Sequence, residues 1–126
     1  MITLTVRDLL NMKDVLQTMA NTPMAAKDSL NMYRMLKVFD KEYEGISETQ
    51  ANLLKKYVAK EGEEYLTDKN GNYVIATEQM EDYNKEAIEF LNTAIEFNIN
   101  PLSWNAVENM KLTPNQISTL EKIMEG

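Results

Sequence analysis

The spacing of apolar residues changes several times along the chain, and each change predicts a new element of secondary structure. Residues 2–6 alternate between apolar and polar side chains, which is the period of a short half-buried strand. Residues 7–20 carry apolar side chains every three or four positions, so they are expected to form a helix. Thr5 and Asp8 can cap the start of this helix, because their short side-chain oxygens accept hydrogen bonds from unpaired amides.

Two separate helices are predicted between residues 23 and 62. The first is expected to run from about Pro23 to Glu44 and to end at Gly45, since proline suits a first helical turn and glycine a C-terminal stop. The second is expected to begin at Ser47-Glu48-Thr49-Gln50, which has the pattern of a capping box, and to end at Gly62.

A β-hairpin is predicted over residues 63–76, because strand-like residues flank an Asn70-Gly71 turn. Thr77 is expected to cap a further helix that runs to about Phe97. Residues 98–102 are expected to be extended, and a short helical turn with Trp104 should follow them. Thr113-Pro114-Asn115-Gln116 is a second capping-box pattern and predicts a last helix.

These elements together predict an α+β fold that is mostly helical. Four to five helices would surround the 64–75 hairpin, and residues 2–6 and 97–102 would form a short strand pair where the termini meet. We expect a single domain over residues 1–126, in which residues 99–126 form a C-terminal extension that packs on the 1–98 body. The residues expected in the core are Leu9, Leu16, Leu36, Phe39, Leu54, Tyr57, Val74, Phe90 and Leu91.

Composition excludes several kinds of chemistry. The chain has 126 residues, 44 % of them hydrophobic, and it contains neither cysteine nor histidine. Disulfides, thiolate nucleophiles, zinc sites built from Cys and His, and imidazole acid–base catalysis are therefore excluded. The four glycines are isolated, so no phosphate-binding glycine-rich loop is present. We expect no cofactor and no catalytic residue.

The charge of the chain is negative and uneven. The net charge is −7, which disfavours direct binding to nucleic acid or to an anionic membrane. Residues 1–39 carry five bases against three acids, whereas residues 40–98 carry fourteen acids against six bases. Such an acidic region can attract a basic protein partner, or it can simply keep a small protein in solution. No apolar run approaches the roughly 20 residues that cross a membrane, and no secretory signal is visible, so we expect an intracellular protein.

Three motifs each have a functional and a purely structural interpretation. Residues 68–72 contain the oxygen-rich side chains of a calcium loop, but the spacing of Gly71 favours a plain hairpin turn. The carboxylates on the predicted helix after Thr77 include candidates for an acid–base pair, but such charge runs are usually solvated helix faces. The nine methionines suit an adaptable binding surface, yet their helical spacing among leucines and aromatics favours the core.

A resemblance adds a biological setting. The segment Leu53-Leu54-Lys55-Lys56-Tyr57 precedes the Asn-Gly hairpin, and the tail contains Ile99-Asn100-Pro101-Leu102 followed by Leu112-Thr113-Pro114-Asn115-Gln116. This order of elements resembles a family of small proteins of tailed phages and prophages of Gram-positive bacteria that carry only a domain-of-unknown-function label. The resemblance implies a structural or accessory role near tail and lysis genes, and it supplies no catalytic residue.

Two functions are therefore expected, both without enzymatic activity. The first is a phage protein of the host cytoplasm that acts by protein–protein interaction, as a small tail, baseplate or assembly accessory, with incorporation into the virion or self-association. Its candidate partner-binding residues are Met24, Met32, Met35 and Trp104. The alternative is an acidic inhibitor of a host defence enzyme, resembling an anti-CRISPR protein that mimics nucleic acid. Its candidates are Glu61, Glu63, Glu64, Asp68, Glu81 and Asp82.

Overall fold

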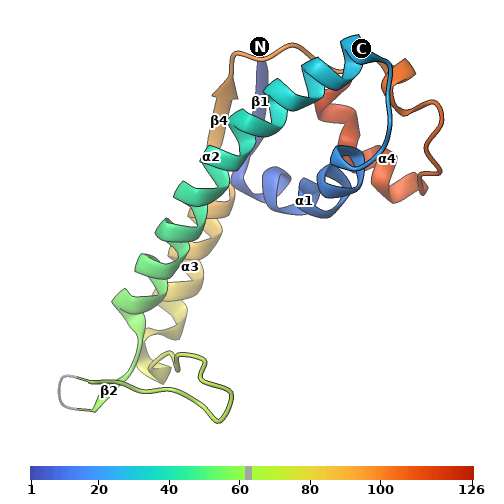
Figure 1. Cartoon of the computed structure of the whole chain (residues 1–126). Coiled ribbons are helices and arrows are strands. Elements are labelled where there is room, and N and C mark those ends of the chain that lie inside the picture. Colours follow the sequence, from blue (N-terminus) through green and yellow to red (C-terminus); the bar gives the residue numbers. More distant parts are fainter. Residues whose placement is uncertain (62–63) are drawn as a thin grey trace.

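The computed structural model describes residues 1–61 and 64–126 and shows an elongated molecule with three parts (Figure 1). The head, residues 1–46 and 94–126, holds both ends of the chain. The stalk, residues 47–57 and 77–93, is a pair of antiparallel helical segments. The tip, residues 58–76, is a small β element at the far end of the stalk. The predicted fold class is confirmed, because the structure is α+β and mostly helical.

The head begins with β1 (Ile2–Thr5) and α1 (Val6–Ala20), as predicted. The Thr5 hydroxyl accepts a hydrogen bond from the Asp8 amide at 3.1 Å, and the Thr5 amide donates to the Asp8 carboxylate at 2.9 Å. This reciprocal capping box confirms the expected helix start. One face of α1 is buried, and its residues are Val6, Leu9, Met12, Val15, Leu16 and Met19.

The two helices predicted between residues 23 and 62 are a single helix, α2 (Ala26–Tyr57). The expected stop at Gly45 and start at Ser47 are therefore wrong. Phe39 and Ile46 lie on one buried face that continues across the glycine, and this packing offsets the roughly 1 kcal/mol that glycine costs inside a helix. The expected start at Pro23 is also wrong, because that proline lies in the loop before the helix.

The chain leaves the tip through a 3₁₀ turn, Thr77–Gln79, and continues as α3 (Met80–Leu91) and β4 (Ala94–Phe97). The expected cap at Thr77 is wrong, since α3 begins without a side-chain cap. The expected helical continuation to Phe97 is wrong as well. β4 instead pairs antiparallel with β1, with Ile2 opposite Phe97. Burial of Phe97 edge-on against Phe39, at 5.1 Å between ring centroids, favours the strand.

The tail folds onto the head through short elements: a 3₁₀ turn (Trp104–Val107), α4 (Pro114–Leu120) and a second 3₁₀ turn (Glu121–Ile123). The Thr113–Gln116 capping box is present as predicted. The strand pair at the termini uses residues 94–97 rather than 97–102. The extended segment at 98–102 instead makes a parallel bridge from Leu102 to Met124.

One hydrophobic core lies in the head, and the tail supplies part of it. Leu102, Leu120, Ile123 and Met124 are buried in the same cluster as β1, α1 and α2. Of the expected core residues, Leu9, Leu16 and Phe39 are buried; Leu36, Leu54, Tyr57, Phe90 and Leu91 are half-buried. Val74 is 39 % exposed, so its assignment to the core is wrong. It lies in the tip, where the described residues form no second layer over it.

Candidate functional site

The four expected apolar binding residues do not form one surface. Met32 and Met35 are 3 % and 1 % exposed, because they lie on the face of α2 that packs into the head core. Met24 is half-buried against the same core. Trp104 is 41 % exposed, and its indole N–H donates to the carbonyl oxygen of Glu125 at 3.0 Å. The expected patch is therefore corrected: its two central methionines are core residues.

The expected acidic residues are spread over two elements. Asp68 begins the hairpin turn, where its carboxylate accepts hydrogen bonds from the amides of Asn70 and Asn72 at 2.8 and 3.0 Å. These bonds and the positive φ of Gly71 confirm the hairpin turn at this position. Glu81 and Asp82 are exposed in the first turn of α3, where the helix dipole favours negative charge.

The remaining three expected acids belong to residues 61–64. Glu63 lies outside the described residues, and so do the side chains of Glu61 and Glu64. Within the part of the chain that the structure describes, no three or more acidic side chains are placed to hold a metal ion.

The tip is held together by a closed ring of three backbone hydrogen bonds. The Ala59 amide donates to the carbonyl of Val74 at 2.7 Å, the Val74 amide to Leu66 at 3.1 Å, and the Leu66 amide to Ala59 at 2.8 Å. Three extended segments thus meet at one junction, and each pairs with both of the others. Two arms leave this junction: β2 (Lys60–Glu61) with β3 (Glu64–Tyr65), and the Asn-Gly hairpin closed by a Thr67–Tyr73 bridge.

Several apolar and aromatic side chains are exposed at this junction. Tyr65, Leu66, Tyr73 and Val74 each expose between 36 and 39 % of their surface. The Tyr65 and Tyr73 rings meet edge-on, with centroids 5.5 Å apart, and the Lys60 ammonium lies 4.9 Å from the Tyr65 centroid. We call these four residues the tip cluster. Val58 is the only buried residue among the described side chains of the tip, so the cluster is not the outer edge of a second core.

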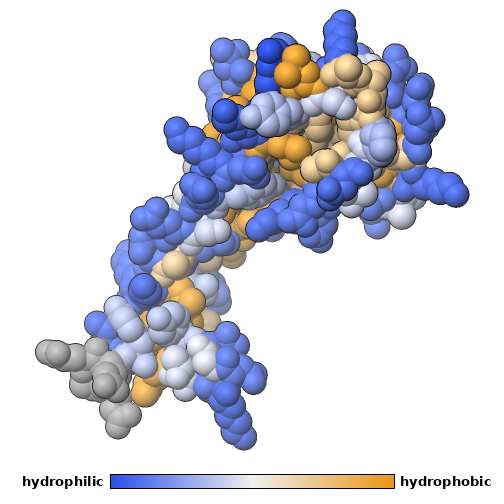
Figure 2. Space-filling model, in the orientation of Figure 1, coloured by the Kyte–Doolittle hydropathy of each residue, from blue (hydrophilic) through white to orange (hydrophobic). Residues whose placement is uncertain are grey.

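The stalk is also incompletely covered. None of its described residues is buried, although Leu53, Leu54, Phe90 and Leu91 line the seam between α2 and α3. A shallow groove of about 350 Å³ opens along this seam. Figure 2 shows apolar surface running in a broken line from the head along the stalk to the tip. A two-helix layer leaves its apolar seam open to water.

Polar and aromatic contacts position the stalk helices. Lys56 and Glu86 form an ion pair at 2.8 Å across the seam, beside the edge-on pair of Tyr57 and Tyr83. The hydrogen bond from Lys56 holds the pKa of Glu86 below its ordinary value and raises the pKa of Lys56. Both groups are solvent-accessible, so the pair orients the helices rather than stabilising them strongly.

The tip cluster is the feature that sequence reasoning missed. The sequence pattern predicts strands for its residues, and the Asn70-Gly71 signal locates one arm correctly. The backbone ring that joins the arms involves no particular side chains, so no sequence signal marks it.

No protein-family model, curated protein or solved structure matches this chain. No helix in the described residues is long and apolar enough to cross a membrane.

Proposed function

We propose that the protein acts without enzymatic activity, by binding another protein through the tip cluster. One observation carries this proposal: the edge-on pair of Tyr65 and Tyr73, with Leu66 and Val74 next to it in the chain, is exposed at the end of a stalk, outside the head core. Tyrosine pairs of this kind are frequent anchors of protein interfaces, because they bury a large area and lose little conformational entropy.

The stalk gives the tip cluster its reach. α3 has twelve residues, so the helical part of the stalk is about 18 Å long at 1.5 Å per residue. The ion pair of Lys56 with Glu86 and the contact of Tyr57 with Tyr83 brace the two helices near the tip. A partner can therefore engage the tip while the head remains clear of the contact.

We place this activity in a phage-infected cell, following the family resemblance of the sequence. The proposed partner is a virion protein, so the chain would serve as a small tail, baseplate or assembly accessory. An apolar cluster with two aromatic rings favours a partner that offers an apolar pocket. Such a contact tolerates high salt, because it depends little on exposed charge.

The acidic inhibitor remains the alternative proposal. It is favoured by the exposed carboxylates of Glu81, Asp82 and Glu89 on α3. Asp68 supports it less, because two backbone amides already donate to its Oδ1. A basic host enzyme bound in this way would be released by salt, since exposed charges are screened.

An affinity purification from phage-infected host lysate tests both proposals. The tagged wild-type chain is compared with a Tyr65→Ala/Tyr73→Ala variant at low salt and at about 0.5 M salt. Ile117→Ala is the matched control, because Ile117 is a 41 % exposed apolar residue of α4, remote from the tip. Mass spectrometry identifies the retained proteins.

We expect virion proteins to be retained at both salt concentrations by the wild-type chain and by Ile117→Ala. The Tyr65→Ala/Tyr73→Ala variant should lose them. Equal retention by the tip variant would refute binding through the tip cluster. Retention of a host nuclease that is lost at high salt, and is insensitive to the tip substitutions, would favour the acidic inhibitor.

A further inference from the structure

The outer surface of α2 in the head carries an unpartnered basic stripe. Its residues recur at helical spacing of three and four positions: Lys27, Leu30, Arg34, Lys37 and Lys41. We call these five residues the basic face. All five side chains are exposed, and none of the four bases forms an ion pair with a described carboxylate. Four positive charges therefore line about four turns of one helix in a chain whose net charge is −7.

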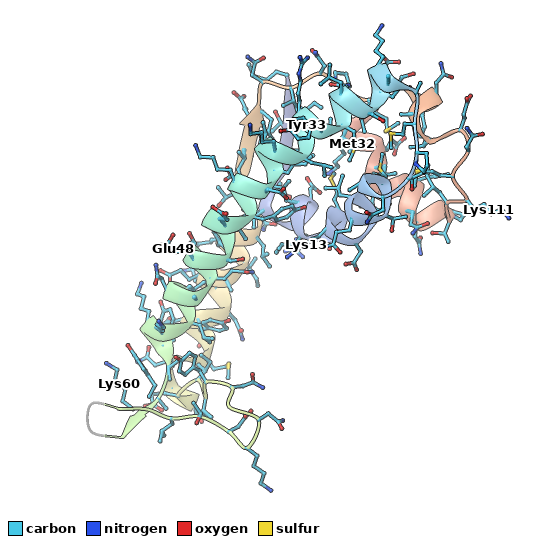
Figure 3. The ribbon with its side chains drawn as sticks, in the orientation of Figure 1. Lys13, Met32, Tyr33, Glu48, Lys60 and Lys111 are labelled. Carbon is cyan, nitrogen blue, oxygen red and sulfur yellow. The ribbon has the colours of Figure 1, made fainter. Side chains whose placement is uncertain are left out.

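Exposed apolar side chains accompany these bases. Leu30 is 49 % exposed and Tyr33, next to the basic face, is 59 % exposed. The Lys37 ammonium lies 5.9 Å from the centroid of the Tyr33 ring. Figure 3 labels Tyr33 and its neighbour Met32 on α2; Met32 is buried in the core, whereas Tyr33 is exposed. The helix thus has an inner face in the core and an outer face that combines apolar and basic groups.

The stalk carries a face of opposite charge. Glu78, Glu81, Asp82, Lys85 and Glu89 are all exposed and lie within three turns along α3 and the turn before it. We call these five residues the acidic face; it holds four acids and one base. Ile88, 52 % exposed, adds an apolar group beside it. The basic face lies in the head and the acidic face in the stalk, so the two belong to different parts of one molecule (Figure 1).

We propose that copies of the protein associate head to stalk, with the basic face of one copy against the acidic face of the next. The two faces are comparable in length, since 15 and 12 helical residues span about 22 and 18 Å. The two faces carry charges of opposite sign, and each has an apolar component. Every copy of the chain has one basic face and one acidic face. Each copy therefore uses its basic face on one neighbour and its acidic face on another, so the contact can repeat.

The geometry of this contact determines what it builds. Two different surfaces meet, so the interface is heterologous and generates chains or closed rings rather than a two-fold dimer. Neither face includes a tip residue, so the inference extends beyond the proposed partner binding and leaves the tip cluster accessible. One helix face on another buries less than the roughly 800 Å² per partner of a standard stable interface. The association should therefore depend on protein concentration and on salt.

Sedimentation velocity over a concentration series tests the inference, first with the wild-type chain. We expect species larger than the monomer at low salt, and at least tenfold weaker association at about 0.5 M salt, because exposed charges are screened over a few ångströms there. A wild-type chain that stays monomeric at low salt would overturn the inference. So would association that salt leaves unchanged, which would point to the apolar stalk seam instead.

Charge reversal then identifies the two faces. The first variant is Arg34→Glu/Lys37→Glu/Lys41→Glu and the second is Glu81→Lys/Asp82→Lys/Glu89→Lys. Each should be monomeric alone, because its two faces then carry charge of the same sign. An equal mixture should associate as the wild type does, since each variant offers the face that the other now requires. Both variants keep a net negative charge, so general attraction between them does not explain such rescue.

Two controls complete the design. Lys111→Glu changes charge in the head away from both faces and should associate as the wild type does (Figure 3). Circular dichroism verifies folding; exposed Glu and Lys are good helix formers, so the reversals should be tolerated. Failure of the mixture to associate, with both variants folded, would refute this pairing of faces. The Tyr65→Ala/Tyr73→Ala variant should self-associate normally, so loss of partner binding and loss of self-association are distinguishable.

Discussion

The hydroxyl of Tyr43 on α2 donates a hydrogen bond to the carbonyl oxygen of Leu9 on α1. The same ring lies 5.5 Å below the Lys13 ammonium, also on α1. Burial of the phenol, together with the negative charge of Asp40, raises the pKa of Tyr43 to about 12. These contacts fasten the two longest helices together at the base of the head, one turn before Ile46, the last buried residue of α2.

Replacing Tyr43 with phenylalanine should lower the free energy of unfolding by about 1 kcal/mol, the net value of one hydrogen bond. It should also change the alkaline behaviour. In the unfolded chain the phenol ionises near its ordinary pKa of 10.0, so wild-type stability falls as the pH rises from 10 towards 12. Urea unfolding over this range should show a flatter profile for Tyr43→Phe.

Tyr33→Phe is the matched control, because Tyr33 is 59 % exposed on the outer surface of the same helix. It should leave both the stability and its alkaline profile unchanged. An equal effect of the two substitutions would mean that the bond to Leu9 contributes nothing.

The continuity of α2 is tested at Gly45. This glycine lies inside the helix, and a Cβ built on it meets nothing within 4 Å. Gly45→Ala should therefore raise the free energy of unfolding by about 1 kcal/mol, the difference in helix propensity between the two residues. If the helix ended at Gly45, as the sequence pattern predicts, the substitution would be neutral or destabilising.

Gly71→Ala should have the opposite sign. Gly71 has φ of +80°, a region that residues with a Cβ avoid, so alanine there should cost about 1 kcal/mol. Chemical denaturation of the two variants measures both effects. The two variants compare the same glycine-to-alanine change inside a helix, at Gly45, and at a positive φ, at Gly71.

Local patterns predicted the helix starts where nothing distant competes with them. The pairs Thr5–Asp8 and Thr113–Gln116 form the expected capping boxes, because all their donors and acceptors lie within three residues. Ser47 and Gln50 present the same pattern in the middle of α2. There the burial of Ile46 favours a continuous helix, and a sequence pattern of four residues contains no information about that contact.

The candidate surfaces depend on contacts between distant parts of the chain more than the helix starts do. The uneven charge is visible in the sequence. Arg34 and Glu81 belong to separate faces of opposite charge only because α2 and α3 place them on different parts of the molecule. The exposure of Tyr65 and Tyr73 could not be predicted, because strand residues with this pattern are as often buried. Whether a second layer covers a strand residue depends on the whole fold, not on the residues beside it in the sequence.

The tail should behave as part of the head core. Leu120 is fully buried among residues from both ends of the chain, so Leu120→Ala should lower the free energy of unfolding by about 2–5 kcal/mol. Ile117→Ala, on the exposed side of the same helix, should cost less than about 1 kcal/mol. Urea unfolding distinguishes these values. A small effect at Leu120 would mean that residues 99–126 are an appendage that the head does not require.

Acid should weaken the link between α1 and the tail through Asp8. Its carboxylate accepts from the Thr5 amide and pairs with Lys122 at 2.9 Å. Burial by itself would raise the pKa of Asp8, but these hydrogen bonds and the charge of Lys122 bring the pKa below its ordinary value of 3.8. Because the pKa is lower in the folded chain, the contribution to stability is present above pH 3.8 and is lost as the pH falls through the folded-state pKa.

Asp8→Asn should therefore cost about 1 kcal/mol at neutral pH, the value of a helix cap, and should reduce the loss of stability in acid. Asp14→Asn removes the same charge from an exposed position of α1 and serves as the control. Thermal unfolding from neutral pH down to pH 3 compares the two variants with the wild type. A parallel decline of all three with falling pH would show that acid acts through other carboxylates, and that the bridge from Asp8 to Lys122 does not help to hold the tail in place.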